Sequence, residues 1–213
     1  MDIPILSLLI CLPTLGALFI LFTTAKSEKY NSHKYNSIFI SLVNFILSIY
    51  LWYKFDNSKN DFQFIENIDW IYGYINYKVG VDGISILFII LTTFITPICI
   101  LSVNSTIKNR VKDFLIAILV MESLMIGVFC SLDLVVFYLF FEAGLIPMLL
   151  IIGIWGGERR VYSAFKFFLY TLLGSVLMLV AIISIYWITG TTDVEKLYQM
   201  GIDAKYQKLL WLA

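Results

Sequence analysis

The stretch LVVFYLFFEAGLIPMLLIIGI, Leu134 to Ile154, decides the fold of this chain. It carries a single charged residue, Glu142, and has the length of roughly 20 residues that an α-helix needs to cross a bilayer. The regular alternation of polar and apolar residues that marks a membrane β-strand is absent. The stretch therefore predicts a membrane-spanning α-helix.

Other runs of the same length and character occur along the chain, of which 60% is hydrophobic and only 14% charged. Soluble domains carry roughly 25% charged residues, so water does not solvate this chain throughout. The pattern predicts an all-α fold, a polytopic bundle of about six membrane-spanning helices. The further predicted helices are Ile3–Phe22, Ser37–Tyr53, Gly83–Val103, Phe114–Ser131 and Tyr162–Ile188.

The predicted helices divide the chain into three segments. Residues 1–82 hold two helices and a long aromatic loop, which is predicted to lie in the headgroup layer without chemistry of its own. A short hairpin turning at Gly73 is compatible with this loop. Residues 83–188 hold helices three to six. Residues 189–213 form a polar tail that ends in an apolar run, the expected start of a truncated seventh helix.

Lysine and arginine residues gather in alternate connections between the helices. The first, third and fifth connections carry most of them, the fourth carries none, and acidic residues outnumber lysines in the second. Because positive residues stay on the cytoplasmic side, we expect a periplasmic N-terminus, or its mitochondrial equivalent. The residues that set this orientation are Lys26, Lys29, Lys34, Lys108, Arg110, Lys112, Arg159 and Arg160.

Several chemistries are not predicted. The formal net charge is zero, which gives no basic surplus for binding nucleic acid. The cysteines lie singly in apolar runs, and the only histidine, His33, falls in a predicted polar loop, so no metal or haem site is expected. Gly156 and Gly157 lack the lysine of a phosphate-binding loop. Any redox cofactor is therefore expected in partner proteins.

Two carboxylates fall near the centres of predicted helices. Glu142 lies roughly 3 Å from the bilayer midplane by helix rise, where an ionisable group usually marks an ion or proton path. Pro147 removes the hydrogen bond to the carbonyl of Ala143, which leaves an acceptor beside Glu142. Glu122 is expected at a similar depth on the preceding helix and would form a coupled pair with Glu142 if their faces meet. A hydrogen-bonded, purely structural acid is the alternative for both.

Lys166 enters the sixth helix about a turn from its cytoplasmic end. It is roughly 10 Å from Glu142 along the membrane normal, too far for a direct pair. A role in proton transfer and a role as an anchor that snorkels to the headgroups are equally consistent with this position.

The stretch LVVFYLFFEAGLIPMLLIIGIWGGERRVYSAFKFFLYTLLGSVLMLVAI, Leu134 to Ile182, resembles helices five and six of the M chain of bacterial NADH:quinone oxidoreductase, complex I. The mitochondrial counterpart is NADH dehydrogenase subunit 4. VGVDGISILFIILTTFITPICIL, Val79 to Leu101, is similar to the third helix of that family and its entry. The resemblance covers the whole chain but only the N-terminal portion of the family.

The resemblance implies a proton-pumping subunit of the membrane arm, in a bacterial or mitochondrial inner membrane. Helices three to six would begin its proton-channel half, with Glu142 matching a glutamate that pairs with a lysine of helix seven. That lysine would lie beyond Ala213. Glu122 and Lys166 also fit the family pattern, which implies roles in proton translocation for them. FMN, iron–sulfur clusters and quinone would be handled by other complex I subunits, and this chain would hold no redox site.

Two rival interpretations remain open. The first is a subunit of a multi-subunit Na⁺/H⁺ antiporter or of a membrane-bound hydrogenase, whose fifth and sixth helices look similar, although IGIWGG and FKFFLYTLLGS favour the respiratory enzyme. The second is a truncated membrane fragment that inserts but does not pump, since the chain stops within an apolar run.

Overall fold

A computed structural model describes residues 4–23, 30–59, 61–71, 75–107, 109–201 and 204–212. Within this part of the chain six helices are long and apolar enough to cross a membrane, which confirms the predicted bundle. Their bounds are α1 Ile5–Phe22, α2 Tyr30–Lys54, α3 Ser85–Thr106, α4 Val111–Cys130, α5 Leu134–Trp155 and α6 Arg160–Thr189.

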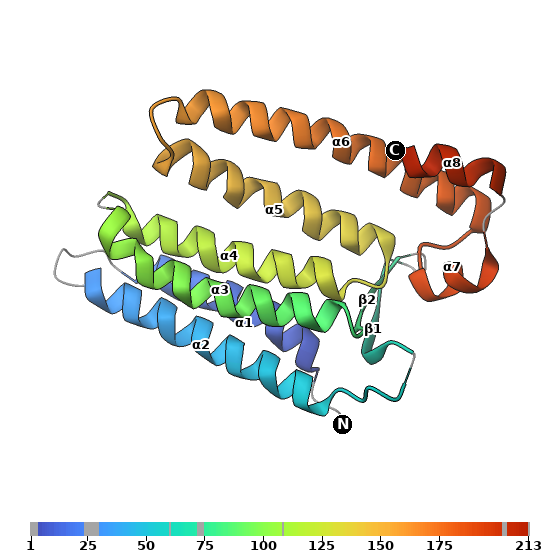
Figure 1. Ribbon diagram of the computed structural model, residues 1–213, viewed down its shortest axis with the longest axis horizontal. Helices are drawn as coiled ribbons and strands as arrows, with labels where there is room; N and C mark the ends of the chain where they lie inside the picture. The colour runs from blue at the N-terminus through green and yellow to red at the C-terminus, as the bar shows by residue number, and fades with distance from the viewer. Residues whose placement is uncertain are drawn as a thin grey trace.

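The first four long helices pack as a group, and the last two extend it on one side (Figure 1). In the group, α1 packs against α2 and α4, and α3 packs against the same two helices. On the outer side α5 packs against α4, and α6 packs against α5. The core therefore lies among α1 to α4, where its largest buried side chains include Leu9, Ile20, Ile89, Leu115 and Leu119.

Local signals fix the ends of α5 and α6. Asp133 caps α5, because its Oδ1 accepts hydrogen bonds from the backbone N–H groups of Val135 and Val136 at 2.8 and 3.3 Å. Gly190 ends α6 with φ of 72°, a left-handed conformation that glycine adopts without a steric penalty. The start of α5 and the C-terminus of α6 therefore lie at the same end of the bundle.

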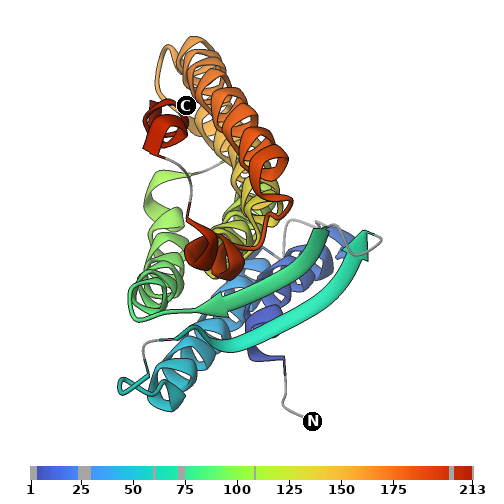
Figure 2. The ribbon, with the colours of Figure 1, turned by 90° about the vertical axis from the view of Figure 1, so that its right-hand side faces the viewer.

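An antiparallel hairpin closes that end, with strands β1 Gln63–Ile71 and β2 Ile75–Val81. Figure 2 shows the strands crossing the ends of α1 and α2. Glu66 of β1 accepts hydrogen bonds from the backbone N–H groups of Leu6 and Ser7, so it satisfies donors that the first turn of α1 leaves unpaired. The sequence predicted an interfacial loop here and did not require strands, and Gly73, the turn position considered for a hairpin, lies outside the described residues.

Two short helices follow the bundle, α7 Val194–Met200 and α8 Ala204–Leu212. The backbone of Leu132 bonds to Lys78 of β2 on one side and to Val194 on the other, both at 2.9 Å. The connection between α4 and α5 is thus sandwiched between the hairpin and the start of α7. The tail predicted as polar, residues 189–213, contains both short helices.

The second helix begins earlier than the sequence suggested. It starts at Tyr30 rather than Ser37, so His33 lies in α2 and not in a loop, and its side chain is only 6% exposed. Hydropathy locates the apolar part of a helix, whereas His33 and Lys34 belong to a polar extension that packs against the ends of other helices. Lys34 Nζ donates to the carbonyl of Leu101 in α3 at 3.2 Å.

Candidate functional site

Glu142 lies in the third turn of α5, near the middle of the membrane span. The side chain is partly buried, and its Oε2 has no hydrogen-bond partner among the described residues. Helix α5 continues through Pro147, which has no N–H to donate to the carbonyl of Ala143. A carboxyl oxygen without a partner and a carbonyl that lacks its usual helical donor thus lie one residue apart along α5.

Glu122 lies in α4 and is much more deeply buried, with 2% of its surface exposed. Its Oε1 accepts a hydrogen bond from Asn44 Nδ2 of α2 at 2.9 Å. Its Oε2 is buried and has no partner among the described residues. The adjacent Ser123 donates to the backbone carbonyl of Ile10 in α1, so this turn of α4 makes polar contacts with two helices of the first group.

The two carboxylates lie at similar depths but do not face each other. A Cβ on Gly127 of α4 would lie 2.5 Å from Cδ1 of Phe140 of α5, which puts these two residues at one level. Counting from there at about 1.5 Å per residue, Glu122 and Glu142 differ in depth by about 4–5 Å. Leu124 shares a cavity with Phe140 of α5. Glu122 precedes Leu124 by two residues and so lies about 200° around α4 from it. Its side chain points to α2 rather than to α5.

Lys166 lies in the second turn of α6, with its side chain exposed. Its Nζ is 5.9 Å from the centroid of the Tyr162 ring, within the range of a cation–π contact. Among the described residues it forms no ion pair with Glu142. The structure therefore leaves Lys166 separate from both carboxylates.

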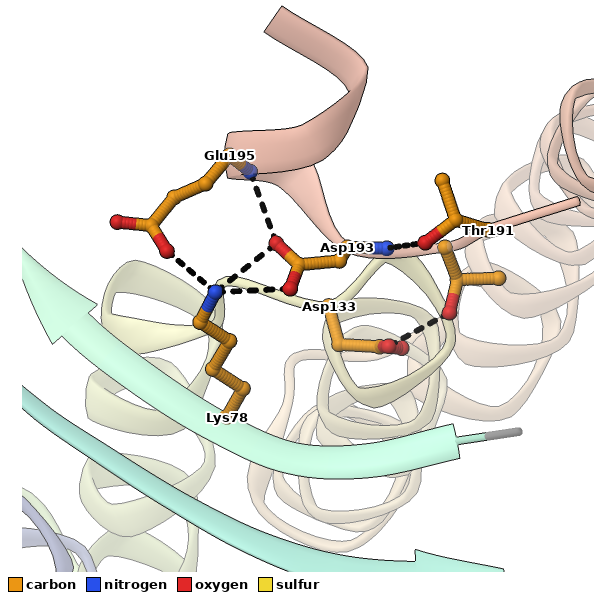
Figure 3. A network of polar contacts seen from close by, with 6 residues as sticks. Lys78, Asp133, Thr191, Asp193 and Glu195 are labelled. Carbon is orange, nitrogen blue, oxygen red and sulfur yellow. Dashed lines mark hydrogen bonds and ion pairs between the residues drawn. The ribbon is translucent and has the colours of Figure 1, made fainter. Parts of the chain in front are cut away.

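A further charged cluster lies where the hairpin meets α7, and Figure 3 shows Lys78 of β2 pointing to two carboxylates there. Lys78 Nζ donates to both oxygens of Asp193, at 3.0 and 2.8 Å, and to Glu195. In the same network the hydroxyl of Thr192 donates to Asp133 Oδ2 at 2.6 Å. The cluster ties together the hairpin, the start of α5 and the start of α7.

Electrostatics favours the charged form of Lys78. Burial acts to lower the pKa of its ammonium group, but the hydrogen bonds to Asp193 and Glu195, together with their charges, outweigh burial and raise the pKa above its usual value. The side chain of Lys78 is 9% exposed, so this ion pair is largely withdrawn from solvent. It is a structural tie outside the membrane-spanning helices.

The partners of Glu122 and Lys78 are distant in the chain and were not predicted from the sequence. One signal for Asn44 was present: polar residues recur on α2 at spacings of three and four, which places them on one helix face. These residues are Ser37, Ser41, Asn44 and Ser48, and each is 0% exposed. The described residues contain no group of three metal-ligating side chains.

Residues 131–213 match the family described as NADH:quinone oxidoreductase/Mrp antiporter, TM. Subunit M of NADH-quinone oxidoreductase from Rhodobacter capsulatus is 55% identical over 179 residues, which are 84% of this chain and 34% of that protein. NADH-ubiquinone oxidoreductase chain 4 from Marchantia polymorpha is 47% identical over 210 residues, 98% of this chain and 42% of that protein. This chain is similar to the M subunits of complex I. It spans less than half the length of these M-subunit relatives.

Solved structures agree with this similarity. The structure described as respiratory complex I from Thermus thermophilus with bound NADH contains a chain that matches 97% of this one and is itself covered to 42%, with 27% identity and a TM-score of 0.82. A chain of the membrane-bound sulfane sulfur reductase, an archaeal respiratory membrane complex, has a TM-score of 0.76 at 19% identity, which shows a shared fold alone. The bundle is therefore the fold of complex I membrane subunits.

Proposed function

We propose that this chain is part of a membrane-arm subunit of respiratory NADH:quinone oxidoreductase that translocates protons while other subunits transfer electrons from NADH to quinone. The observation that carries the proposal is Glu142, a carboxyl in mid-span with an unpartnered oxygen, in a chain 47% identical to an NADH-ubiquinone oxidoreductase chain over 98% of its length. The names of the relatives do not favour the antiporter or the non-pumping fragment.

The chemistry assigned to Glu142 is the binding and release of one proton. In the neutral form the carboxyl is tolerated inside the membrane, whereas the charged form needs water or a cation close by. The carbonyl of Ala143 offers a hydrogen-bond acceptor next to the carboxyl, suited to holding water or the acid proton. In this proposal the chain holds no redox group; FMN, iron–sulfur clusters and quinone belong to the other complex I subunits.

The proposed setting is a bacterial or mitochondrial inner membrane, with the N-terminus on the periplasmic side or its mitochondrial equivalent. The distribution of lysine and arginine supports this orientation. The difference between the two ends of the bundle supports it too. Lys34 and Lys112 lie at the end opposite the hairpin, where they donate to backbone carbonyls near the C-terminal ends of α3 and α1. Glu122 and Lys166 are proposed as secondary proton-transfer groups.

Glu142→Gln in the full-length subunit, within the assembled complex, tests the proposal. The amide preserves shape but does not bind and release a proton, so we expect normal assembly and a large loss of NADH-driven acidification in membrane vesicles. Glu158→Gln makes the same chemical change in the exposed connection after α5 and is the matched control. Full acidification and normal quinone reduction with Glu142→Gln would overturn the proposal.

A further inference from the structure

The polar face of α2 is buried inside the first group of helices. Three of its members are satisfied locally: Ser37 donates to the carbonyl of His33 at 2.9 Å and Ser41 to that of Ile38 at 3.0 Å. Ser48 donates to the carbonyl of Phe45 at 2.7 Å and also contacts the hydroxyl of Thr93 in α3 at 2.7 Å. Serine hydroxyls in membrane helices commonly bond to their own backbone in this way. Asn44 differs from them because its amide bonds to an ionisable group, the Glu122 carboxyl in α4.

The contact between Asn44 and Glu122 leaves one atom on each side without a partner. Asn44 Nδ2 donates to Glu122 Oε1, whereas Asn44 Oδ1 and Glu122 Oε2 have no hydrogen-bond partner among the described residues. Asn44 is 0% exposed and Glu122 is 2% exposed, so bulk water does not satisfy these atoms. Unpaired buried polar atoms are rare in native proteins and require a physical explanation.

Protonation of the Glu122 carboxyl accounts for both unpaired atoms, Glu122 Oε2 and Asn44 Oδ1. As a carboxylate, Glu122 has only acceptors, and its Oε2 cannot pair with the other acceptor, Asn44 Oδ1. As a neutral acid it gains an O–H donor, and an acid and a primary amide can form two complementary hydrogen bonds. The described part of the chain supplies no lysine or arginine paired with Glu122 that would stabilise its charge. The amide therefore recognises the protonated form.

We propose that Glu122 and Asn44 form a second proton-binding site, on the face of α4 opposite α5 and separate from Glu142. One O–H bond forms at Glu122 Oε2 when a proton arrives from water and breaks when the proton returns to water. Asn44 is the positioning residue, since it holds the acid through the other oxygen. A glutamine would make the same two hydrogen bonds without titrating, so a carboxyl at this point adds the capacity to exchange a proton.

Infrared spectroscopy of the purified intact complex at neutral pH tests the protonation. The spectrum of the wild type minus that of Glu122→Gln should contain the carbonyl band of one protonated carboxylic acid. Asn44→Leu, whose side chain has the same number and branching of heavy atoms, should keep this band and shift it to higher frequency, because the amide donor to Oε1 is lost. Ser41→Ala, one turn away and bonded only to its own helix, should leave the band unchanged. A carboxylate band, or an acid band insensitive to Asn44→Leu, would refute the site.

Proton pumping tests exchange at the site, and this step rests on the proposed function. Glu122→Gln should preserve assembly, since its amide can still pair with Asn44, but should lower NADH-driven acidification. Wild-type acidification in that variant would reduce Glu122 to a structural acid and overturn the proposal. Glu142→Gln measured in parallel separates the two ideas: full pumping there refutes the proposed function, while the infrared band still reports on Glu122.

Discussion

At the scale of single residues, the buried ionisable groups of this protein contact partners that are far away in the sequence. Lys78 binds Asp193, 115 residues on, and Glu122 binds Asn44, 78 residues back. A charge withdrawn from water needs such partners, because desolvation is costly when it is unpaired. Sequence patterns located Glu122 and Glu142 by depth within a helix. They do not identify partners, since which faces meet depends on how all the helices pack.

Lys78→Met should loosen the attachment of α7 to the hairpin. The substitution removes hydrogen bonds from a charged donor and leaves Asp193 and Glu195 facing each other, so we expect a loss of about 2 kcal/mol. The thermal midpoint at which this subunit dissociates from the purified complex should fall. Lys196→Met removes an exposed lysine of α7 and should have little effect. Equal midpoints for the two variants would contradict this role of Lys78.

The Lys78 ammonium group of this cluster predicts a pH dependence on the alkaline side. The pKa of Lys78 is raised in the folded protein, so its stabilising effect is fully present below the ordinary lysine pKa of about 10.4 and is lost as pH rises through the higher folded value. The difference in thermal midpoint between wild type and Lys78→Met should therefore be constant around neutral pH and shrink in strongly alkaline buffer.

At the scale of helices and strands, the length of the apolar runs predicted the membrane-spanning helices but not the elements outside those runs. The spans of α1, α3, α4, α5 and α6 follow from runs of about 20 apolar residues, because lipid leaves the backbone no other partners. The polar extension of α2 and the hairpin lie outside those runs and depend on contacts such as Glu66 with the start of α1. Hydropathy does not detect such contacts.

Gly127→Ala should disturb the contact between α4 and α5. Its Cβ would lie 2.5 Å from Cδ1 of Phe140, and overpacking typically costs about 1–3 kcal/mol, more than the gain of at most about 1 kcal/mol from replacing a helical glycine. We expect a lower thermal midpoint and reduced pumping, because a shifted α5 carries Glu142 with it. Gly174→Ala in α6 meets no atom within 4 Å and is the matched control. Phe140→Leu should partly rescue Gly127→Ala.

At the scale of the whole molecule, the two ends of the bundle differ in structure and charge. The hairpin and α7 occupy one end (Figure 2). The ion pairs of Lys78 join them there, and Asp193, Glu195 and Asp133 add negative charge. At the other end Lys112 Nζ donates to the carbonyls of Leu21 and Thr23, where the negative end of the α1 dipole lies. Lys112 thus has a structural role at that end.

This asymmetry predicts how the chain lies in its membrane. The hairpin end should face the periplasm and the end with the basic connections should face the cytoplasm. Asn57→Cys, in the exposed segment before β1, should react with a membrane-impermeant maleimide in intact bacterial cells, whereas Glu158→Cys should react only after permeabilisation. The parent protein with Cys11, Cys99 and Cys130 gives the background. The opposite labelling pattern would invert the orientation and place the cluster around Lys78 on the cytoplasmic side, against the positive-inside distribution from which the topology was inferred.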